Sequence, residues 1–408
     1  MHTSTIRALA AASLFVAGLA FAGASQKHRT DAPSMAKRAL AGDAAAIAGL
    51  RASGQAGVDA IFAAGGTSNP AVADQVCGQF DCATSRLFWH TDLDQAKRVA
   101  AAQGRPILSL RLLGRLDEEL SCANSRFFRA TLYPNAEVNE ILRDTYVLHW
   151  ETVREVPKVT IDFGDGRKLE RTLTGNSIHY VLDSRGRPVD GIPGLHGAKA
   201  FASLLTRSGT LATKTAALDG DARRAALRDF HGKRLDAIAT EWKKDLSKIG
   251  AAPEIRKNAT TSERLAAFDK ASDDHWDEIA ARHTDDAQLD AASRRAASPL
   301  MPPDADTAGR LAATKMAVER PMLRQFDVLE RSLQLDGVQN EYRLHPRLHL
   351  WFKEGSVPDD ASRLNERVYD EIFLMPLSDP WLGLSPKNAF SGITADGRRI
   401  GVAPARPR

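Results

Sequence analysis

Two short apolar runs on either side of a helical segment restrict the fold of this chain more than any other feature. Residues 106–110 form a short, mainly aliphatic run bounded by Gly104 and Gly114, which is typical of a buried strand. Residues 146–150 form a second apolar run, and Asn135 is a suitable N-cap for the helix that precedes it. A strand, a helix and a strand in this order predict a βαβ unit with parallel strands and a right-handed crossover.

Cys122 lies between these two strands, at a position where a helix is expected to begin. Backbone N–H groups and the positive end of a helix dipole stabilise a thiolate at such a position. We therefore expect a lowered pKa for Cys122. The alternative is a small buried residue that packs as a hydrophobe, as free cysteines often do.

The chain beyond the βαβ unit predicts two hairpins. Residues 159–163 and 169–173 flank the turn Asp165-Gly166, and this hairpin would cover the cysteine face or extend the edge of the sheet. Residues 177–183 predict a third strand of the central sheet, and residues 188–194 its short antiparallel partner. A closing helix is expected after that partner.

With these elements in this order, residues 84–210 resemble a thioredoxin-like domain. That family carries W-C-x-x-C at the start of the helix after its first strand, and the corresponding residues here are Leu120-Ser121-Cys122-Ala123-Asn124-Ser125. Ser125 thus stands in the place of the second cysteine, and Ser177 in the place of the family's cis-proline. The resemblance implies an α/β thioredoxin-like domain with a β-hairpin insertion.

The same resemblance implies thiol–disulfide exchange at Cys122, with Ser125 and His179 as the other candidate catalytic residues. His179 lies two residues beyond Ser177 and hence on the same face of its strand, where it could act as a base; a histidine that merely packs under a helix is the alternative. Without a second thiol, a mixed disulfide cannot be released within the chain.

Two functions follow from this arrangement. The first is monothiol disulfide exchange through Cys122 with a protein thiol or disulfide as partner, which would make the chain a thiol–disulfide oxidoreductase. The second is a catalytically inactive thioredoxin-like scaffold or binding protein in which Cys122 is structural.

Residues 1–24 resemble a secretory signal. Arg7 precedes an apolar run, and small residues at a cleavage site follow it. The run is shorter than the about 20 apolar residues that span a bilayer. We therefore expect a periplasmic or secreted chain with no membrane span after cleavage.

An oxidising compartment affects how the three cysteines are interpreted. Cys77 and Cys82 are five positions apart with Gly78 between them, which predicts a local disulfide. Cys122 is then a free thiol or has an intermolecular partner. A pairing of Cys122 with Cys77 or with Cys82 is the alternative.

The rest of the chain is expected to be mainly helical. Residues 25–83 form an N-terminal extension, residues 211–376 a helical region and residues 377–408 a C-terminal tail. We expect the apolar stripes of the helical region to be core and assign them no cofactor. The net charge of +4 is spread without a basic stripe, which argues against nucleic acid as a partner.

His345 and His349 are four positions apart, which is a metal-ligand spacing on a helix. Pro346 lies between them, however, and no H-E-x-x-H motif is present. We therefore expect these histidines to pack with their apolar neighbours and assign no metal site.

Overall fold

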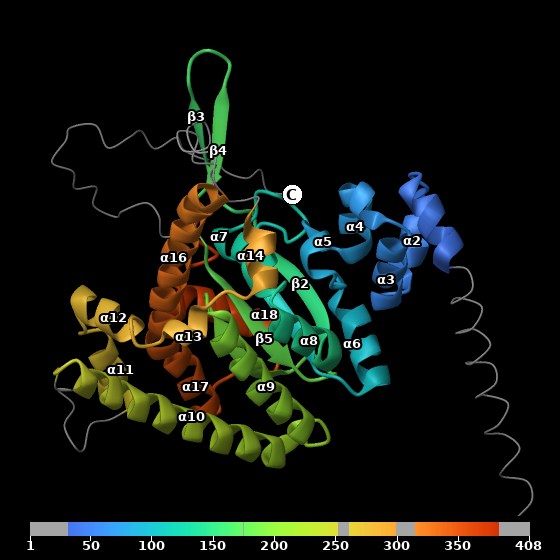
Figure 1. Cartoon of the computed structure of the whole chain (residues 1–408). Coiled ribbons are helices and arrows are strands. Elements are labelled where there is room, and N and C mark those ends of the chain that lie inside the picture. Colours follow the sequence, from blue (N-terminus) through green and yellow to red (C-terminus); the bar gives the residue numbers. More distant parts are fainter. Residues whose placement is uncertain (1–31, 174, 252–260, 299–314, 383–408) are drawn as a thin grey trace, which may run out of the picture.

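The computed structural model describes residues 32–173, 175–251, 261–298 and 315–382. The signal-like residues 1–24 and most of the C-terminal tail therefore lie outside the described residues. The described chain is a mixed α/β structure, in which helices surround one four-stranded sheet (Figure 1).

The central sheet has the strand order β2-β1-β5-β6. Strand β1 (Ile107–Leu113) pairs in parallel with β2 (Val147–Arg154), which confirms the parallel pair predicted from the two apolar runs. Strand β5 (Ser177–Leu182) is antiparallel to β1, and β6 (Pro188–Pro193) is antiparallel to β5. Every residue of β1, β5 and β6 is buried, so both faces of these strands are covered.

Five helical elements accompany the strands. They are α6 (Leu93–Gln103), α7 (Ala123–Phe127), the π-helical turn η2 (Phe128–Leu132), α8 (Ala136–Thr145) and α9 (Ala198–Thr215). Asn135 caps α8 by accepting a hydrogen bond from the amide of Val138, as its position predicts. Helix α8 packs on α9, and α6 packs on β2.

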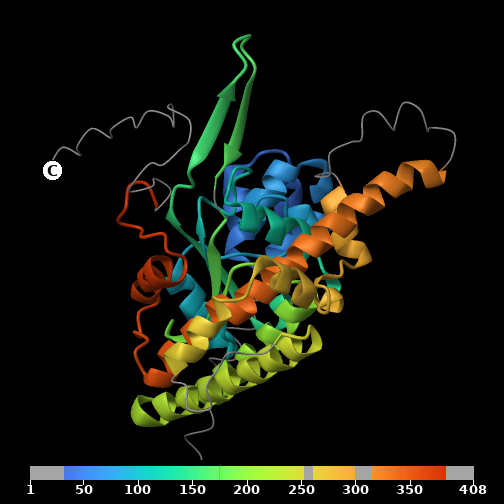
Figure 2. The same cartoon turned by 90° about the vertical axis from the view of Figure 1, so that its left-hand side faces the viewer.

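The inserted hairpin consists of β3 (Lys158–Asp162) and β4 (Lys168–Thr172), which confirms the hairpin predicted around Asp165-Gly166. This hairpin forms a separate two-stranded sheet. The alternative in which it extends the edge of the central sheet is therefore excluded. Figures 1 and 2 show it projecting away from the rest of the molecule. Its apolar residues Ile161 and Phe163 are exposed as a consequence.

The N-terminal extension is helical and has a small core of its own. Its elements are α2 (Ala44–Ala52), α3 (Gln55–Ala63), η1 (Gly66–Ser68), α4 (Pro70–Cys77) and α5 (Cys82–Ser85). A disulfide joins Cys77 at the end of α4 to Cys82 at the start of α5. The amide of Trp89 donates to the carbonyl oxygen of Cys77, which ties this extension to the chain that leads into the sheet domain.

The C-terminal region is mainly helical, as expected. Its elements are α10 (Gly220–Lys248), α11 (Thr261–Phe268), α12 (Asp273–Ala280), α13 (Thr284–Ala287), α14 (Ala291–Ala297), α16 (Lys315–Gln339), the π-helical turn η4 (Asn340–Leu344), α17 (His345–Glu354), α18 (Ala361–Arg367) and the π-helical turn η5 (Val368–Ile372). Within the described ranges, no helix combines the length and apolar character needed to cross a membrane.

The C-terminal helices cover the open edge of the sheet at β6. The side chain of Arg223 in α10 donates to the carbonyl oxygen of Pro188 at 2.7 Å, and His231 in α10 bonds the carbonyl oxygen of Val189 at 3.0 Å. Leu348 of α17 and Tyr369 of η5 belong to the same buried cluster as the strands. An edge strand exposes unpaired backbone groups, and α10 provides partners for two of them, the carbonyl groups of Pro188 and Val189.

Candidate functional site

Cys122 is the residue on which the predicted chemistry depends, and the structure places it at the N-cap of α7, directly after the loop that follows β1. Its amide donates to the carbonyl oxygen of Leu113 at 3.2 Å, and its own carbonyl oxygen accepts from the amide of Ser125 at 3.1 Å. The expected position at a helix start is therefore confirmed. The Cys122 side chain is, however, entirely buried.

The prediction of a lowered pKa for Cys122 is wrong. Burial raises the pKa of the thiol, and this effect outweighs the hydrogen bonds of Ser125 and the backbone contact to Leu113, which favour the thiolate. Helix α7 has only five residues, so its dipole contributes little against the loss of solvent. The thiol remains protonated and shielded from water at neutral pH.

Ser125 is buried beside Cys122, where its hydroxyl group bonds main-chain and serine oxygens. It donates to the carbonyl oxygen of Cys122 at 2.8 Å and contacts the hydroxyl of Ser121. These bonds stabilise the first turn of α7. Ser125 thus serves the local backbone.

His179 is also fully buried, on the face of β5 that contacts aromatic rings. Its Nε2 lies 2.8 Å from the hydroxyl of Tyr133, and its ring packs on Phe128 and Phe201. Burial lowers the pKa of His179 to about 3, so the imidazole is neutral. Among the described residues its hydrogen-bond partner is Tyr133, and no hydrogen bond joins it to the Cys122 sulfur.

The Cys77–Cys82 disulfide leaves Cys122 as the free cysteine of the chain. The two bridged residues have Cα atoms 6.2 Å apart. Asp74 supports the bridge because its carboxylate accepts a hydrogen bond from the amide of Cys82 at 2.8 Å. The alternative pairings of Cys122 with either of these cysteines do not occur in this structure.

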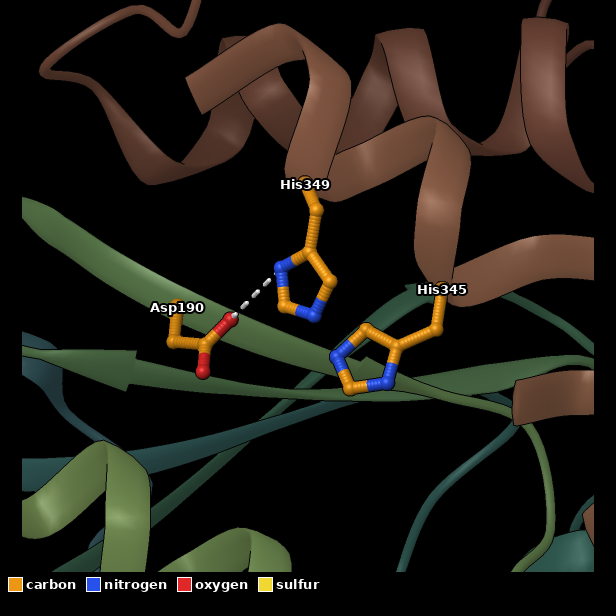
Figure 3. A group of neighbouring side chains, drawn as sticks. All are labelled: Asp190, His345 and His349. Carbon is orange, nitrogen blue, oxygen red and sulfur yellow. Dashed lines mark ion pairs between the residues drawn. The ribbon is translucent and has the colours of Figure 1, made fainter. Parts of the chain in front are cut away.

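A second group of titratable side chains lies where the C-terminal helices meet the edge of the sheet. It consists of Asp190 from β6, His231 from α10, and His345 and His349 from α17, and we call it the histidine cluster. All four side chains are at least 97 % buried. One ligand atom each of Asp190, His345 and His349 lies within 4.8 Å of the others, and Figure 3 shows these three side chains converging.

Helix α17 places both of its histidines in the histidine cluster. Pro346 occupies the first turn of the helix, where the missing N–H costs no intrahelical hydrogen bond. The helix is therefore intact over Pro346, and the i, i+4 spacing puts the two imidazole rings on one face, stacked with centroids 4.1 Å apart.

Hydrogen bonds hold the members of the cluster in place. Nδ1 of His345 lies 2.9 Å from the carboxylate of Glu341, and Nδ1 of His349 lies 2.8 Å from Nδ1 of His231. The carboxylate of Asp190 accepts from the hydroxyl of Ser208 at 2.6 Å and from the amide of Gly191 at 2.8 Å.

A cavity of about 400 Å³ lies beside the histidine cluster, between α9, α10, α13, α16 and η4. Its lining is of mixed polarity and includes His196, Arg207, Arg234, Glu241 and Glu341. Glu341 connects the two features, because it lines the cavity and bonds both Arg234 and His345. The cavity is large enough for a small polar ligand.

Sequence reasoning identified part of this second site. The i, i+4 spacing of His345 and His349 was visible, but Pro346 argued against a helix there. His231 lies in the apolar stripe of α10, four positions after Leu227 and four before Leu235. A histidine in such a stripe is the signal that was missed, whereas no local pattern marks Asp190.

Comparison of the chain with protein-family models, with curated proteins and with solved structures found no match.

Proposed function

We propose that this protein is an exported thioredoxin-like binding protein in which Cys122 is structural and carries no redox activity. The thioredoxin-like part of the proposal is supported by the arrangement of the sheet. Two parallel strands joined through α7 and α8 are followed by two antiparallel strands and a closing helix, α9. Export is supported by the signal-like residues 1–24.

The burial of Cys122 is the observation that favours a binding protein over monothiol exchange. A thiol attacks a disulfide as the exposed thiolate, and Cys122 has no exposed surface and a raised pKa. Ser125, in the place of a second cysteine, is buried and bonds the carbonyl oxygen of Cys122 and the hydroxyl of Ser121. Neither side chain is available to a partner disulfide.

The cavity bounded by α9, α10, α13, α16 and η4 is the proposed binding site. Arg207, Arg234 and Lys199 supply positive groups to its lining, and Glu241, Asp286 and Glu341 supply negative ones. Such a lining suits a small polar molecule that carries groups of both signs. The site lies between α9 and helices of the C-terminal region, and Cys122 is not among its lining residues.

Alkylation of the purified mature protein tests the proposal, with labelled residues mapped by mass spectrometry. We expect no labelling of Cys122 in the native protein between pH 6 and 9 and complete labelling after denaturation in urea. The Cys122→Ala variant serves as the control for background labelling. Rapid native labelling, with a midpoint below the free-cysteine value of about 8.5, would overturn the proposal in favour of monothiol exchange.

A further inference from the structure

Two imidazole nitrogens of the histidine cluster have no partner among the described residues. Nε2 of His345 and Nε2 of His349 are buried and make no hydrogen bond. A buried polar atom without a partner costs about 1–3 kcal/mol. Two such atoms on neighbouring rings of one helix face are available to a further group.

The hydrogen bonds determine which proton His345 carries. The carboxylate of Glu341 also forms a 3.0 Å ion pair with Arg234, so it is an acceptor. Nδ1–H of His345 therefore donates to Glu341. In the neutral imidazole, Nε2 of His345 then carries a free lone pair.

The same reasoning applies to His349 through His231. Nε2 of His231 lies 3.0 Å from the carbonyl oxygen of Val189, which can only accept, so this nitrogen of His231 donates. A neutral imidazole has one donor and one acceptor nitrogen, so Nδ1 of His231 accepts. His349 must donate to it from Nδ1. Nε2 of His349 is thus a second free lone pair.

Asp190 supplies a carboxylate to the same cluster, within 4.8 Å of one ring nitrogen each of His345 and His349. Its Oδ1 lies 3.9 Å from Nδ1 of His349 and 4.0 Å from Nδ1 of His231, as the dashed line in Figure 3 marks for His349. Ser208 and Gly191 each donate one hydrogen bond to this carboxylate, which leaves further lone pairs on its oxygens.

We propose that His345, His349 and Asp190 bind one divalent transition-metal ion, and that Zn²⁺ suits the site best. Imidazole nitrogen and carboxylate oxygen are common ligands of Zn²⁺, and three protein ligands leave a fourth position open. Metal-binding histidines usually donate their other N–H to a carboxylate or a carbonyl group. His345 does so to Glu341, whereas Nδ1 of His349 bonds Nδ1 of His231, whose Nε2 in turn donates to the carbonyl oxygen of Val189.

The charges around the site make Asp190 the decisive ligand. Arg207 and Arg234 line the cavity beside the histidine cluster. They disfavour a cation at the same position, and Glu341 neutralises Arg234 through a 3.0 Å ion pair. The negative charge of Asp190 then offsets the positive charge of Arg207. Removal of the negative charge at residue 190 should therefore weaken metal binding more than it disturbs the hydrogen bonds of that residue.

This site goes beyond the proposed function, because it involves neither Cys122 nor redox chemistry. Glu341 connects the site with the neighbouring cavity, because it lines the cavity and bonds His345. A metal with an open position beside a 400 Å³ cavity could also take a ligand atom from a bound small molecule.

Zinc competition measures the site directly. The mature full chain, produced without a histidine tag and stripped with EDTA, is titrated with Zn²⁺ in the presence of a chromophoric chelator. We expect one Zn²⁺ per chain. Asp190→Asn and His349→Gln should each weaken binding more than about 100-fold, because loss of even a hydrogen-bonding partner of a ligand costs 10–100-fold. Glu341→Gln, which changes a positioning residue, should cost about 10–100-fold.

The matched control is His149→Gln. His149 is also buried, bonds Ser109 through Nδ1 and has an unpartnered Nε2, but the strand registers put it on the face of the sheet opposite Asp190. The His149→Gln variant should bind Zn²⁺ as tightly as the unaltered chain does. Near-UV circular dichroism establishes that each variant is folded.

Binding of Co²⁺ to the unaltered chain gives a readout that needs no variant. Four-coordinate Co²⁺ with nitrogen and oxygen ligands absorbs in the visible range, and Zn²⁺ should displace this absorption at one equivalent. The proposal is wrong if the unaltered chain binds no stoichiometric Zn²⁺, or if folded Asp190→Asn and His349→Gln bind it unchanged. Neither result depends on the thiol state of Cys122.

Discussion

Cys122 and the histidine cluster are buried to the same degree, yet their polar atoms are in different situations. Around Cys122 the hydroxyl and backbone groups bond one another, and the thiol itself tolerates an apolar site. His179, on the neighbouring strand, has one unpartnered nitrogen among aromatic rings. The histidine cluster has two unpartnered nitrogens, and Asp190, His345 and His349 each place one ligand atom within 4.8 Å of the others.

This comparison shows that burial alone does not identify a functional site. One unpaired nitrogen surrounded by rings is a tolerated cost of a tightly packed core. Several unpaired atoms that face one another, with their other atoms held by hydrogen bonds, are arranged to receive a ligand. The position that resembles a known active site is therefore the less reactive of the two.

The largest expected effect separates the two regions by metal-dependent stability. Zn²⁺ at 100 times its dissociation constant should raise the free energy of unfolding by about 2.7 kcal/mol, since the ion binds the folded chain alone. Thermal unfolding with and without Zn²⁺ measures this. Cys122→Ala should keep the whole increase and Asp190→Asn should lose it. If Cys122→Ala lost the increase instead, a thiolate site would replace the histidine cluster as the metal site.

The second-largest effect is a pH dependence of the free energy of unfolding, which arises from His179. The folded pKa of His179 is lowered to about 3 by burial, so below its unfolded value of 6.5 the unfolded chain gains a proton that the folded chain does not. Its contribution to stability is complete above pH 6.5 and is lost as the pH falls from 6.5 towards 3. Between pH 7 and pH 5 the loss is about 2 kcal/mol.

Urea unfolding at pH 7 and pH 5 checks this contribution in the unaltered chain and in His179→Asn. The variant should be less stable at pH 7, because it loses the bond to Tyr133. Its stability should nevertheless change less with pH, by about 2 kcal/mol over this interval. If the stability of His179→Asn depended on pH as much as that of the unaltered chain does, His179 would be accessible to protons, as a catalytic base would be.

A smaller effect is expected from Cys122 itself. Cys122→Ala removes one buried sulfur atom and leaves a small cavity, which should lower the free energy of unfolding by about 1 kcal/mol. Urea unfolding gives this value, and Zn²⁺ affinity should not change. A loss of Zn²⁺ binding in Cys122→Ala would contradict a purely structural role for the thiol.

The smallest effect is expected at the projecting hairpin. Phe163 is 56 % exposed, so Phe163→Ser should change the free energy of unfolding by less than about 0.5 kcal/mol. Neither Zn²⁺ binding nor the burial of Cys122 should change in the Phe163→Ser variant. Protection of Cys122 from alkylation in this variant measures whether the hairpin shields the thiol; rapid labelling would show that it does.

Much of the architecture follows from local patterns. The parallel pair of β1 and β2, the hairpin of β3 and β4, the cap at Asn135 and the helical C-terminal region could all be predicted. Alternating polarity, turn residues and capping residues act over a few positions, so the sequence displays them directly. The position of Cys122 at a helix start was predictable for the same reason.

The environment of those residues was decided only by tertiary structure. Burial depends on which distant elements pack over a residue, and it reversed the expected pKa shift of Cys122. The histidine cluster unites β6, α10 and α17, whose members are separated by 41, 114 and 4 positions along the chain from Asp190 to His349. Sequence determined the strands, helices and turns, because those depend on neighbouring residues. Solvent access and the convergence of side chains depend on packing between distant residues, and so the fold alone determined them.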